Sequence, residues 1–271
     1  MATEIMAGPY GEVRAASTAG GGTALTSTAA RIVLPHGAKY MALIPRNFSS
    51  ANVVKWNKNP YLTVLKTTDL LVTTTNLTDY SSAAQDNDTA TDVVLSSLPT
   101  LASGGSLYIG SRLPFSGLEV DVDSTNGTAS VLSGTYRKSD GTWANISLTD
   151  GTASGGATFA IDGNITWTVP TDWITTRLKD AVAGTPANLG LLNEEFFWVR
   201  LVVSVALDSS TTLNSMIAIN RSTAYAELVS GLAWEESITV GPGGIYSITA
   251  LTDAGTANLI VNTATRQNGA F

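Results

Sequence analysis

Residues 117–123 read Gly117-Leu118-Glu119-Val120-Asp121-Val122-Asp123, in which apolar and acidic side chains alternate. Because successive side chains of a β-strand point to opposite faces, this stretch predicts a strand with one buried and one solvated face. The same period of two recurs in residues 164–169, and again in residues 197–205, where every second residue from Phe197 to Val205 is apolar. Helical periodicity is nearly missing. The sequence therefore predicts an all-β fold.

The expected organisation is two antiparallel, jelly-roll-like β-sandwiches with an extended N-terminal arm. Residues 1–30 are rich in Ala, Gly, Ser and Thr and are expected to form the arm, since they cannot bury enough apolar area to fold alone. We expect residues 31–102 and 225–271 to form the first sandwich and residues 103–224 to form a second, inserted one. The break is placed at Ser103-Gly104-Gly105-Ser106. A simple tandem of two sandwiches is the alternative.

The individual strands of the first sandwich are expected at runs of β-branched and aromatic residues. These runs are residues 31–35, 39–45, 52–56, 61–66, 69–75, 92–96, 226–229, 246–251 and 258–261. One short helix is expected after Pro170, where Thr171 or Asp172 would cap a turn that carries Trp173, Ile174 and Leu178.

The composition limits the classes of partner. Charged residues make up 14% of the chain, below the ~25% usual for soluble domains, and the formal net charge is −7 without a cluster of Lys or Arg. We therefore expect no nucleic-acid partner. The chain has no long apolar run and begins without the pattern of a secretory signal peptide, so no membrane insertion is expected. Cysteine is absent, which excludes disulfides and thiolate chemistry.

The middle of the chain contains a succession of short aromatic and turn motifs. In order they are Leu107-Tyr108-Ile109-Gly110, Pro114-Phe115-Ser116-Gly117-Leu118, Asn126 with Ala129-Ser130-Val131-Leu132, Tyr136, Thr142-Trp143, Thr149-Asp150-Gly151-Thr152, Gly163-Asn164-Ile165-Thr166-Trp167, Pro170-Thr171-Asp172-Trp173 and Phe197-Trp198-Val199-Arg200. This order, over residues 107–205, resembles the β-sandwich modules of structural proteins of tailed bacteriophages and related viruses. One departure is the turn after Tyr136, which is polar here where such modules often carry aromatic residues.

The resemblance implies a non-enzymatic virion protein, located in the virion and assembled in the host cytoplasm. Most simply it would be a capsid decoration or minor capsid protein. It would be homo-oligomeric and would bind the major capsid protein or other virion proteins through its N-terminal arm and sheet edges. The alternative is a tail or baseplate component with a receptor-binding or carbohydrate-binding sandwich, whose partner would be host-surface carbohydrate.

The aromatic residues are expected either in the core or at a carbohydrate-binding surface. Trp143, Trp167, Trp173 and Trp198 are expected in the core, because each ring buries a large apolar area. A carbohydrate-binding groove would instead need exposed rings, for which Tyr136, Trp143 and Trp234 are the candidates.

No catalytic residue, cofactor or metal ligand is assigned. The single histidine, His36, lies in a predicted turn without triad partners nearby in sequence. Hydrolysis of a glycan would need two carboxylates that face each other across a cleft, but the acids of residues 119–123 share one solvent face of a strand. The other candidate acids for such a pair are Glu194, Glu195, Glu235 and Glu236. The segment Asp86-Asn87-Asp88-Thr89-Ala90-Thr91-Asp92 offers oxygen ligands for a hard cation but lacks the central glycine and glutamate of an EF-hand, so an ordinary acidic loop is preferred.

Overall fold

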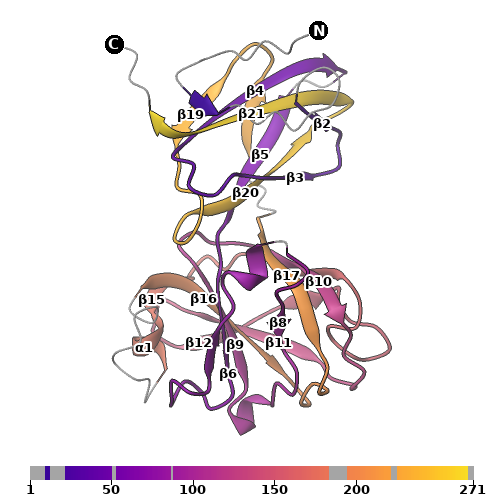
Figure 1. The fold of residues 1–271 in the computed structure, drawn as a ribbon, viewed down its shortest axis with the longest axis vertical. Coiled ribbons are helices and arrows are strands. Elements are labelled where there is room, and N and C mark those ends of the chain that lie inside the picture. Colours follow the sequence, from indigo (N-terminus) through magenta and orange to yellow (C-terminus); the bar gives the residue numbers. More distant parts are fainter. Residues whose placement is uncertain are drawn as a thin grey trace. The chain divides into compact units, whose positions relative to one another are not determined.

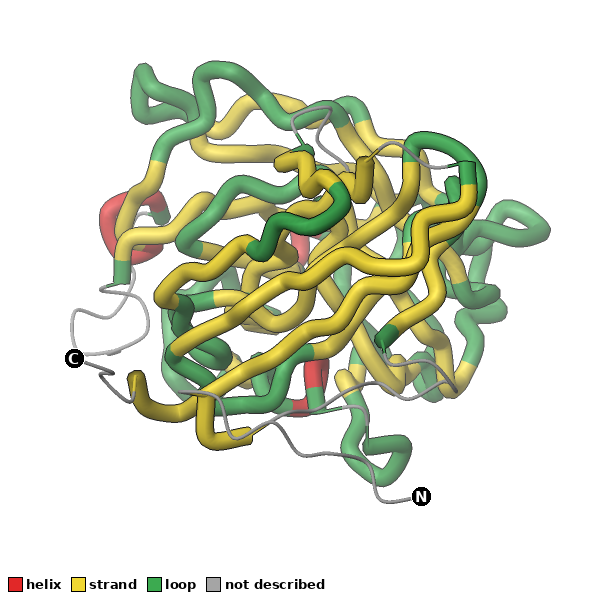
Figure 2. The backbone as a smooth tube through the Cα atoms, turned by 90° about the horizontal axis from the view of Figure 1, so that it is seen from above, coloured by secondary structure: helices red, strands yellow, loops and turns green. Residues whose placement is uncertain are grey.

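The computed structural model describes residues 10–12, 22–50, 53–86, 88–182, 194–220 and 225–267. Strands dominate these residues, and all pairings between their named strands are antiparallel (Figures 1 and 2). The predicted all-β fold is confirmed. The described helices are short: η1 (Ala83–Gln85), η2 (Leu101–Ser103) and α1 (Leu178–Ala181). No described helix is both long and apolar enough to cross a bilayer.

The chain divides into two compact units. Unit 1 comprises residues 1–61 and 222–271, and unit 2 is the contiguous segment of residues 62–221. The first unit is thus built from two segments that are far apart in sequence.

Unit 1 contains two sheets, which we name A and B. Sheet A has the order β1 (Tyr10–Glu12), β21 (Thr256–Gln267), β4 (Tyr40–Ser49), β19 (Trp234–Ser237), with β2 (Thr23–Leu25) also paired to β21. Sheet B has the order β18 (Ala226–Val229), β5 (Val53–Pro60), β20 (Ile245–Thr252), β3 (Ala30–Val33). One buried apolar cluster takes side chains from both sheets, including Met41 and Leu43 from sheet A and Val54 and Ile248 from sheet B.

Unit 2 also contains two sheets, C and D. Sheet C has the order β12 (Trp143–Ile146), β11 (Leu132–Arg137), β16 (Glu195–Val203), β9 (Ser106–Ser111), β6 (Thr63–Thr67), β7 (Leu77–Asp79), with β15 (Thr175–Arg177) also paired to β16. Sheet D has the order β13 (Leu148–Asp150), β14 (Gly163–Trp167), β10 (Gly117–Ser124), β17 (Thr212–Ile219), β8 (Val93–Val94).

Sheet C is apolar on both faces. Its inner face contributes Val64, Ile109, Val199 and Leu201 to a large cluster shared with sheet D, which we call the inner cluster. On its outer face a second cluster, the outer cluster, consists of Leu65, Leu71, Tyr108, Leu178, Phe196 and Trp198. The alternation along β16 supplies both, since neighbouring side chains of a strand point to opposite faces.

Trp198 reaches full burial because the residue opposite it is a glycine. Trp198 pairs with Gly110 of β9, and a Cβ at Gly110 would lie 2.5 Å from the indole ring. The indole Nε1 donates to the carbonyl oxygen of Thr176 at 2.9 Å. Any side chain at position 110 would therefore displace the ring and the strand that accepts its hydrogen bond.

Several sequence-based expectations need correction. The expected boundary at residue 103 lies too late, because β6, β7 and β8 pair with strands of unit 2. Residues 69–75 form a loop instead of a strand: Leu70 and Leu71 have positive φ, and the Asp69 carboxylate accepts hydrogen bonds from the backbone of Val72 and Thr73.

The expected helix after Pro170 is also misplaced. Residues 171 and 172 form a turn, residues 175–177 are strand β15, and α1 begins only at Leu178 without a side-chain cap. Strand β19 is not predicted by the sequence, because Trp234-Glu235-Glu236-Ser237 lacks β-branched residues.

The expected N-terminal arm lies partly outside the described residues. Its described parts pair within the chain: β1 and β2 both bind β21, and Leu25 is buried in the cluster between sheets A and B. Residues 22–30 are therefore ordered within the chain itself, because β2 pairs with the edge of β21 and Leu25 is buried between the sheets.

We predict that Gly110→Ala lowers the free energy of unfolding by about 1–3 kcal/mol, the usual cost of overpacking a core. Gly127→Ala is the matched control, because a Cβ there would meet only the Asp208 carboxylate at 3.5 Å. Chemical denaturation followed by tryptophan fluorescence measures both. Equal stability of the two variants would contradict the packing argument.

Candidate functional site

A groove of about 730 Å³ lies in unit 2 where sheets C and D meet at one side. It is lined by Tyr136, Asn145, Ile146, Ser147, Thr149, Thr166, Trp167, Thr168, Val169, Pro170 and Thr171. The chain crosses from β12 in sheet C to β13 in sheet D through Ser147, so the groove runs along this crossing. Its wall is mainly hydroxyl and amide groups over an aromatic floor.

The two floor residues are held by hydrogen bonds within the chain. The Tyr136 hydroxyl donates to Oδ1 of Asp172 at 2.8 Å, and Nε1 of Trp167 donates to the carbonyl oxygen of Phe115 at 2.9 Å. Both rings are buried, with 9% and 6% of their surface exposed. They therefore act as a fixed floor and present little open ring face to a ligand.

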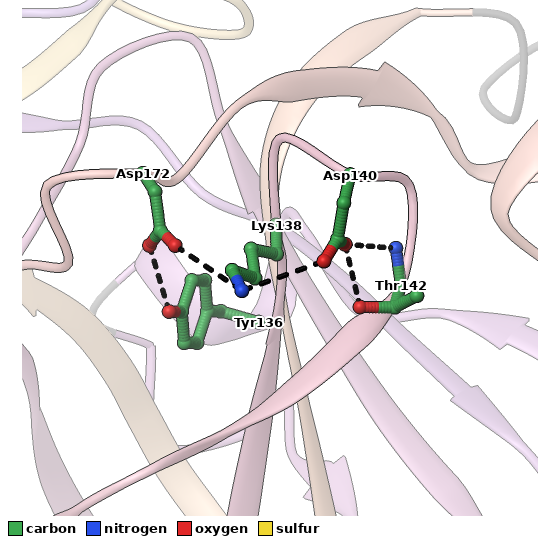
Figure 3. A network of polar contacts seen from close by, with 5 residues as sticks. All are labelled: Tyr136, Lys138, Asp140, Thr142 and Asp172. Carbon is green, nitrogen blue, oxygen red and sulfur yellow. Dashed lines mark hydrogen bonds and ion pairs between the residues drawn. The ribbon is translucent and has the colours of Figure 1, made fainter.

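A polar network borders the groove on the Tyr136 side (Figure 3). Nζ of Lys138 lies between two carboxylates, 3.4 Å from Oδ2 of Asp140 and 3.8 Å from Oδ2 of Asp172. Asp140 also accepts hydrogen bonds from the backbone nitrogen and the hydroxyl of Thr142, at 2.9 Å and 2.6 Å. The network fixes the turn between β11 and β12 against the segment after Pro170.

These contacts shift two pKa values in opposite directions. The hydrogen bond to Asp172 raises the pKa of Tyr136, because the carboxylate stabilises the protonated phenol and repels the phenolate. The hydrogen bonds from Thr142 lower the pKa of Asp140, because they favour its charged form. At neutral pH the phenol is therefore a donor and the carboxylate is charged, an arrangement suited to binding and positioning.

The three aromatic candidates for carbohydrate binding are separated. Tyr136 faces the inner cluster, whereas Trp143 packs against the outer cluster on the opposite face of sheet C. Nε1 of Trp143 donates to the carbonyl oxygen of Ala181 at 3.1 Å. Trp234 belongs to unit 1, where it is 45% exposed. The prediction that Trp167, Trp173 and Trp198 are core residues is confirmed, while Trp143 is only half-buried.

The acidic candidates for glycan hydrolysis are spread over both units, and all of them except the half-buried Glu236 are exposed. The side chains of Glu119, Asp121 and Asp123 lie on the exposed face of β10, where Asp121 and Asp123 accept hydrogen bonds from Asn214 and Thr212. Glu194 pairs with Arg112 in unit 2, and Glu236 pairs with Lys58 in unit 1. Glu195 begins β16 and Glu235 lies in β19, both exposed.

Among the described residues, neither His36 nor the acidic loop of residues 86–92 lies in a group of side chains placed for catalysis or metal binding. His36 is exposed in a turn, and its imidazole lies so close to Gly241 that a Cβ there would approach Nε2 to 2.6 Å. Asp86 and Asp88 accept hydrogen bonds from the backbone of their own loop, while Asn87 lies outside the described residues. No described group of three or more His, Asp and Glu side chains is placed to hold a metal ion.

Sequence reasoning missed Lys138, Asp140 and Asp172 as parts of one site. Tyr136 and Asp172 are distant in sequence, and only the register of sheet C brings the segment after Pro170 to the Tyr136 hairpin. In the sequence, the Asp140-Gly141 turn was the one feature that pointed to this site. Neither a family model nor a curated protein matches the chain.

We predict that Asp172→Asn lowers the pKa of Tyr136 toward its ordinary value, since the charged acceptor is removed. Ultraviolet titration of the phenolates, compared with Tyr136→Phe, isolates this group. Asp180→Asn is the control, because Asp180 pairs with Arg177 instead. An unchanged titration in Asp172→Asn would show that the carboxylate does not control the phenol.

Proposed function

We propose that the chain is a non-enzymatic structural protein of a virus particle, most simply a capsid decoration or minor capsid protein. In this proposal the two units are jelly-roll-like sandwiches, with the second inserted into the first. Many copies act in the virion by binding the major capsid protein or other virion proteins. The order of motifs over residues 107–205 and the weakly charged, hydroxyl-rich composition support this proposal.

The observation that carries the proposal is the binding of two short N-terminal strands to one strand edge. Residues Thr23–Leu25 pair with residues 257–259 of β21, and Tyr10–Glu12 pair with its C-terminal part. Backbone hydrogen bonds give such added strands affinity, and a buried side chain such as Leu25 fixes their register. The same mode of addition lets an arm bind the sheet edge of a neighbouring subunit.

The acidic side chains also support a structural function. The carboxylate of Asp208 accepts hydrogen bonds from the backbone of Gly127 at 2.6 Å and of Ser210 at 3.0 Å, and from the Thr211 hydroxyl at 2.7 Å. The hydrogen bond from Gly127, with smaller contributions from Thr211 and Ser210, holds the pKa of Asp208 well below its usual range. Asp69 closes its loop in a similar way. These acids are used to close loops between strands.

The test is light scattering on the purified chain, and then cosedimentation with particles assembled without it. We expect a discrete oligomer and saturable binding. Ala24→Pro removes a backbone donor from the middle of β2 and should weaken binding about tenfold. Ala29→Pro is the control, because Ala29 is exposed and outside the strands. Absence of saturable binding by the unaltered chain would overturn the proposal.

The second candidate function is carbohydrate binding by a tail or baseplate component. It is favoured by the surroundings of Trp234, whose ring centroid lies 6.1 Å from that of Trp56 at an interplanar angle of 58°. Lys58 and Glu236, which form a 2.6 Å ion pair, flank these rings. Nε1 of Trp56 and Oε1 of Glu236 are buried without partners among the described residues. The exposed indole of Trp234 beside the partly exposed Lys58–Glu236 ion pair suits the C–H face and the hydroxyls of a sugar.

If this second candidate is correct, Trp234→Ala should weaken binding of host-surface glycans about tenfold, through loss of the stacking face. Val33→Ala is the matched control, because Val33 is an exposed apolar residue of the same unit at 53% exposure. A glycan array and then calorimetry measure the effect. Retained affinity in Trp234→Ala would exclude this surface as the sugar site.

A further inference from the structure

Two arginines flank Trp143 on the outer face of sheet C. The guanidinium carbons of Arg137 and Arg200 lie 5.9 Å and 4.8 Å from the centroid of the Trp143 ring. Arg200 of β16 lies opposite Thr135 of β11, two residues before Arg137, so both arginines leave the sheet on the same face. One indole thus holds two cations within a small area.

These two charges lack a balancing carboxylate. Among the described residues of unit 2, acids pair with Arg112, Lys138 and Arg177, and none lies within ion-pair distance of Arg137 or Arg200. Residues 183–193, which precede β16, contain neither Asp nor Glu. Two neighbouring cations repel each other, and this repulsion is weakly screened where they are half-buried. The site therefore favours a negative charge supplied from outside the chain.

Hydrogen-bond donors exceed acceptors at the same place. Nε of Arg200 donates to the Thr135 hydroxyl at 3.2 Å and the Arg200 guanidinium also interacts with the Tyr108 hydroxyl, whereas Nε of Arg137 has no partner among the described residues. Tyr108 packs against Trp143, with ring centroids 5.9 Å apart. Burial raises the pKa of Tyr108 against the opposing effect of the Arg200 charge, so the phenol stays protonated at neutral pH. Each guanidinium group carries five N–H donors and no acceptor, so an acceptor-only ligand can pair with the donors of these half-buried side chains that the chain itself leaves over.

We propose that Arg137 and Arg200, positioned by Trp143, form a binding site for an oxyanion of the phosphate or sulfate class. Guanidinium groups bind such oxygens through paired N–H donors, and stacking on the indole restricts both side chains before the ligand arrives. The anion is either a free ion or a group carried on a glycan. This inference does not rest on the virion assignment, because it concerns only the chemistry of one face of unit 2.

The experiment titrates the full chain with sodium sulfate and with sodium phosphate, each balanced with sodium chloride to constant ionic strength. Tryptophan fluorescence and the unfolding temperature are the readouts. We expect a saturable fluorescence change with a higher unfolding temperature, and about tenfold weaker binding in both Arg137→Gln and Arg200→Gln. Arg112→Gln is the matched control, since Arg112 is an exposed guanidinium of the same unit that already has a carboxylate partner, Glu194, at 2.9 Å.

Two further variants keep the test decisive if a glutamine variant fails to fold. Arg137→Lys keeps the charge but loses the guanidinium fork, so it should bind with intermediate affinity. Trp143→Phe keeps an aromatic platform and should bind the anion with most of the fluorescence change lost. A sulfated oligosaccharide and its unsulfated form distinguish the two sources of the anion. Tighter binding of the sulfated oligosaccharide than of free sulfate identifies a glycan-borne group. Equal affinity for the sulfated oligosaccharide and for free sulfate identifies the free ion.

The proposal is overturned if the unaltered chain shows no saturable response to either anion. It is also overturned if Arg112→Gln weakens binding as much as Arg137→Gln, because the response would then reflect the general charge of the surface.

Discussion

Burial of strand β16 on both faces is the constraint on which unit 2 depends. Phe197, Val199, Leu201 and Val203 pack into the inner cluster with sheet D, while Phe196 and Trp198 pack into the outer cluster. A strand of this kind needs cover on both sides, and next to the outer cluster Leu178 of α1 helps to supply it. The glycine opposite Trp198 is what allows that cover to lie close to the sheet.

The double burial also explains why binding chemistry gathers around sheet C. Its edge hairpin, β11 and β12, has the groove with Tyr136 on the inner side and the Arg137–Trp143–Arg200 cluster on the outer side. Alternation along β11 places Tyr136 and Arg137 on opposite faces, so one short hairpin contributes side chains to two surfaces of different chemical character. The groove offers hydroxyls and amides, and the outer face offers cationic donors.

Side-chain alternation made the strands of unit 2 predictable from the sequence, whereas features that depend on single hydrogen-bonding groups were missed. Leu118 and Val120, and Phe197 to Val203, pack in the inner cluster as their period of two predicts. The loop at residues 69–75 has the composition of a strand, and only the Asp69 carboxylate and two leucines with positive φ make it a loop.

The groove depends on the register between the Tyr136 hairpin and the segment around Asp172, which sequence spacing does not contain. Arg137 and Trp143 flank a recognisable turn, but Arg200 joins them only through the pairing of β11 with β16.

The division of unit 1 between two distant segments has a consequence for synthesis on the ribosome. Strand β4 is complete by residue 49, yet its neighbour β21 begins at residue 256, so β4 emerges long before its partner exists (Figure 1). Unit 2, as one contiguous segment, has all its strands available earlier. During translation the apolar face of β4, with Met41 and Leu43, remains without the strand that later lies beside it. The nascent chain therefore carries an open sheet edge for most of its elongation, and in that interval it is most exposed to pairing with another nascent chain.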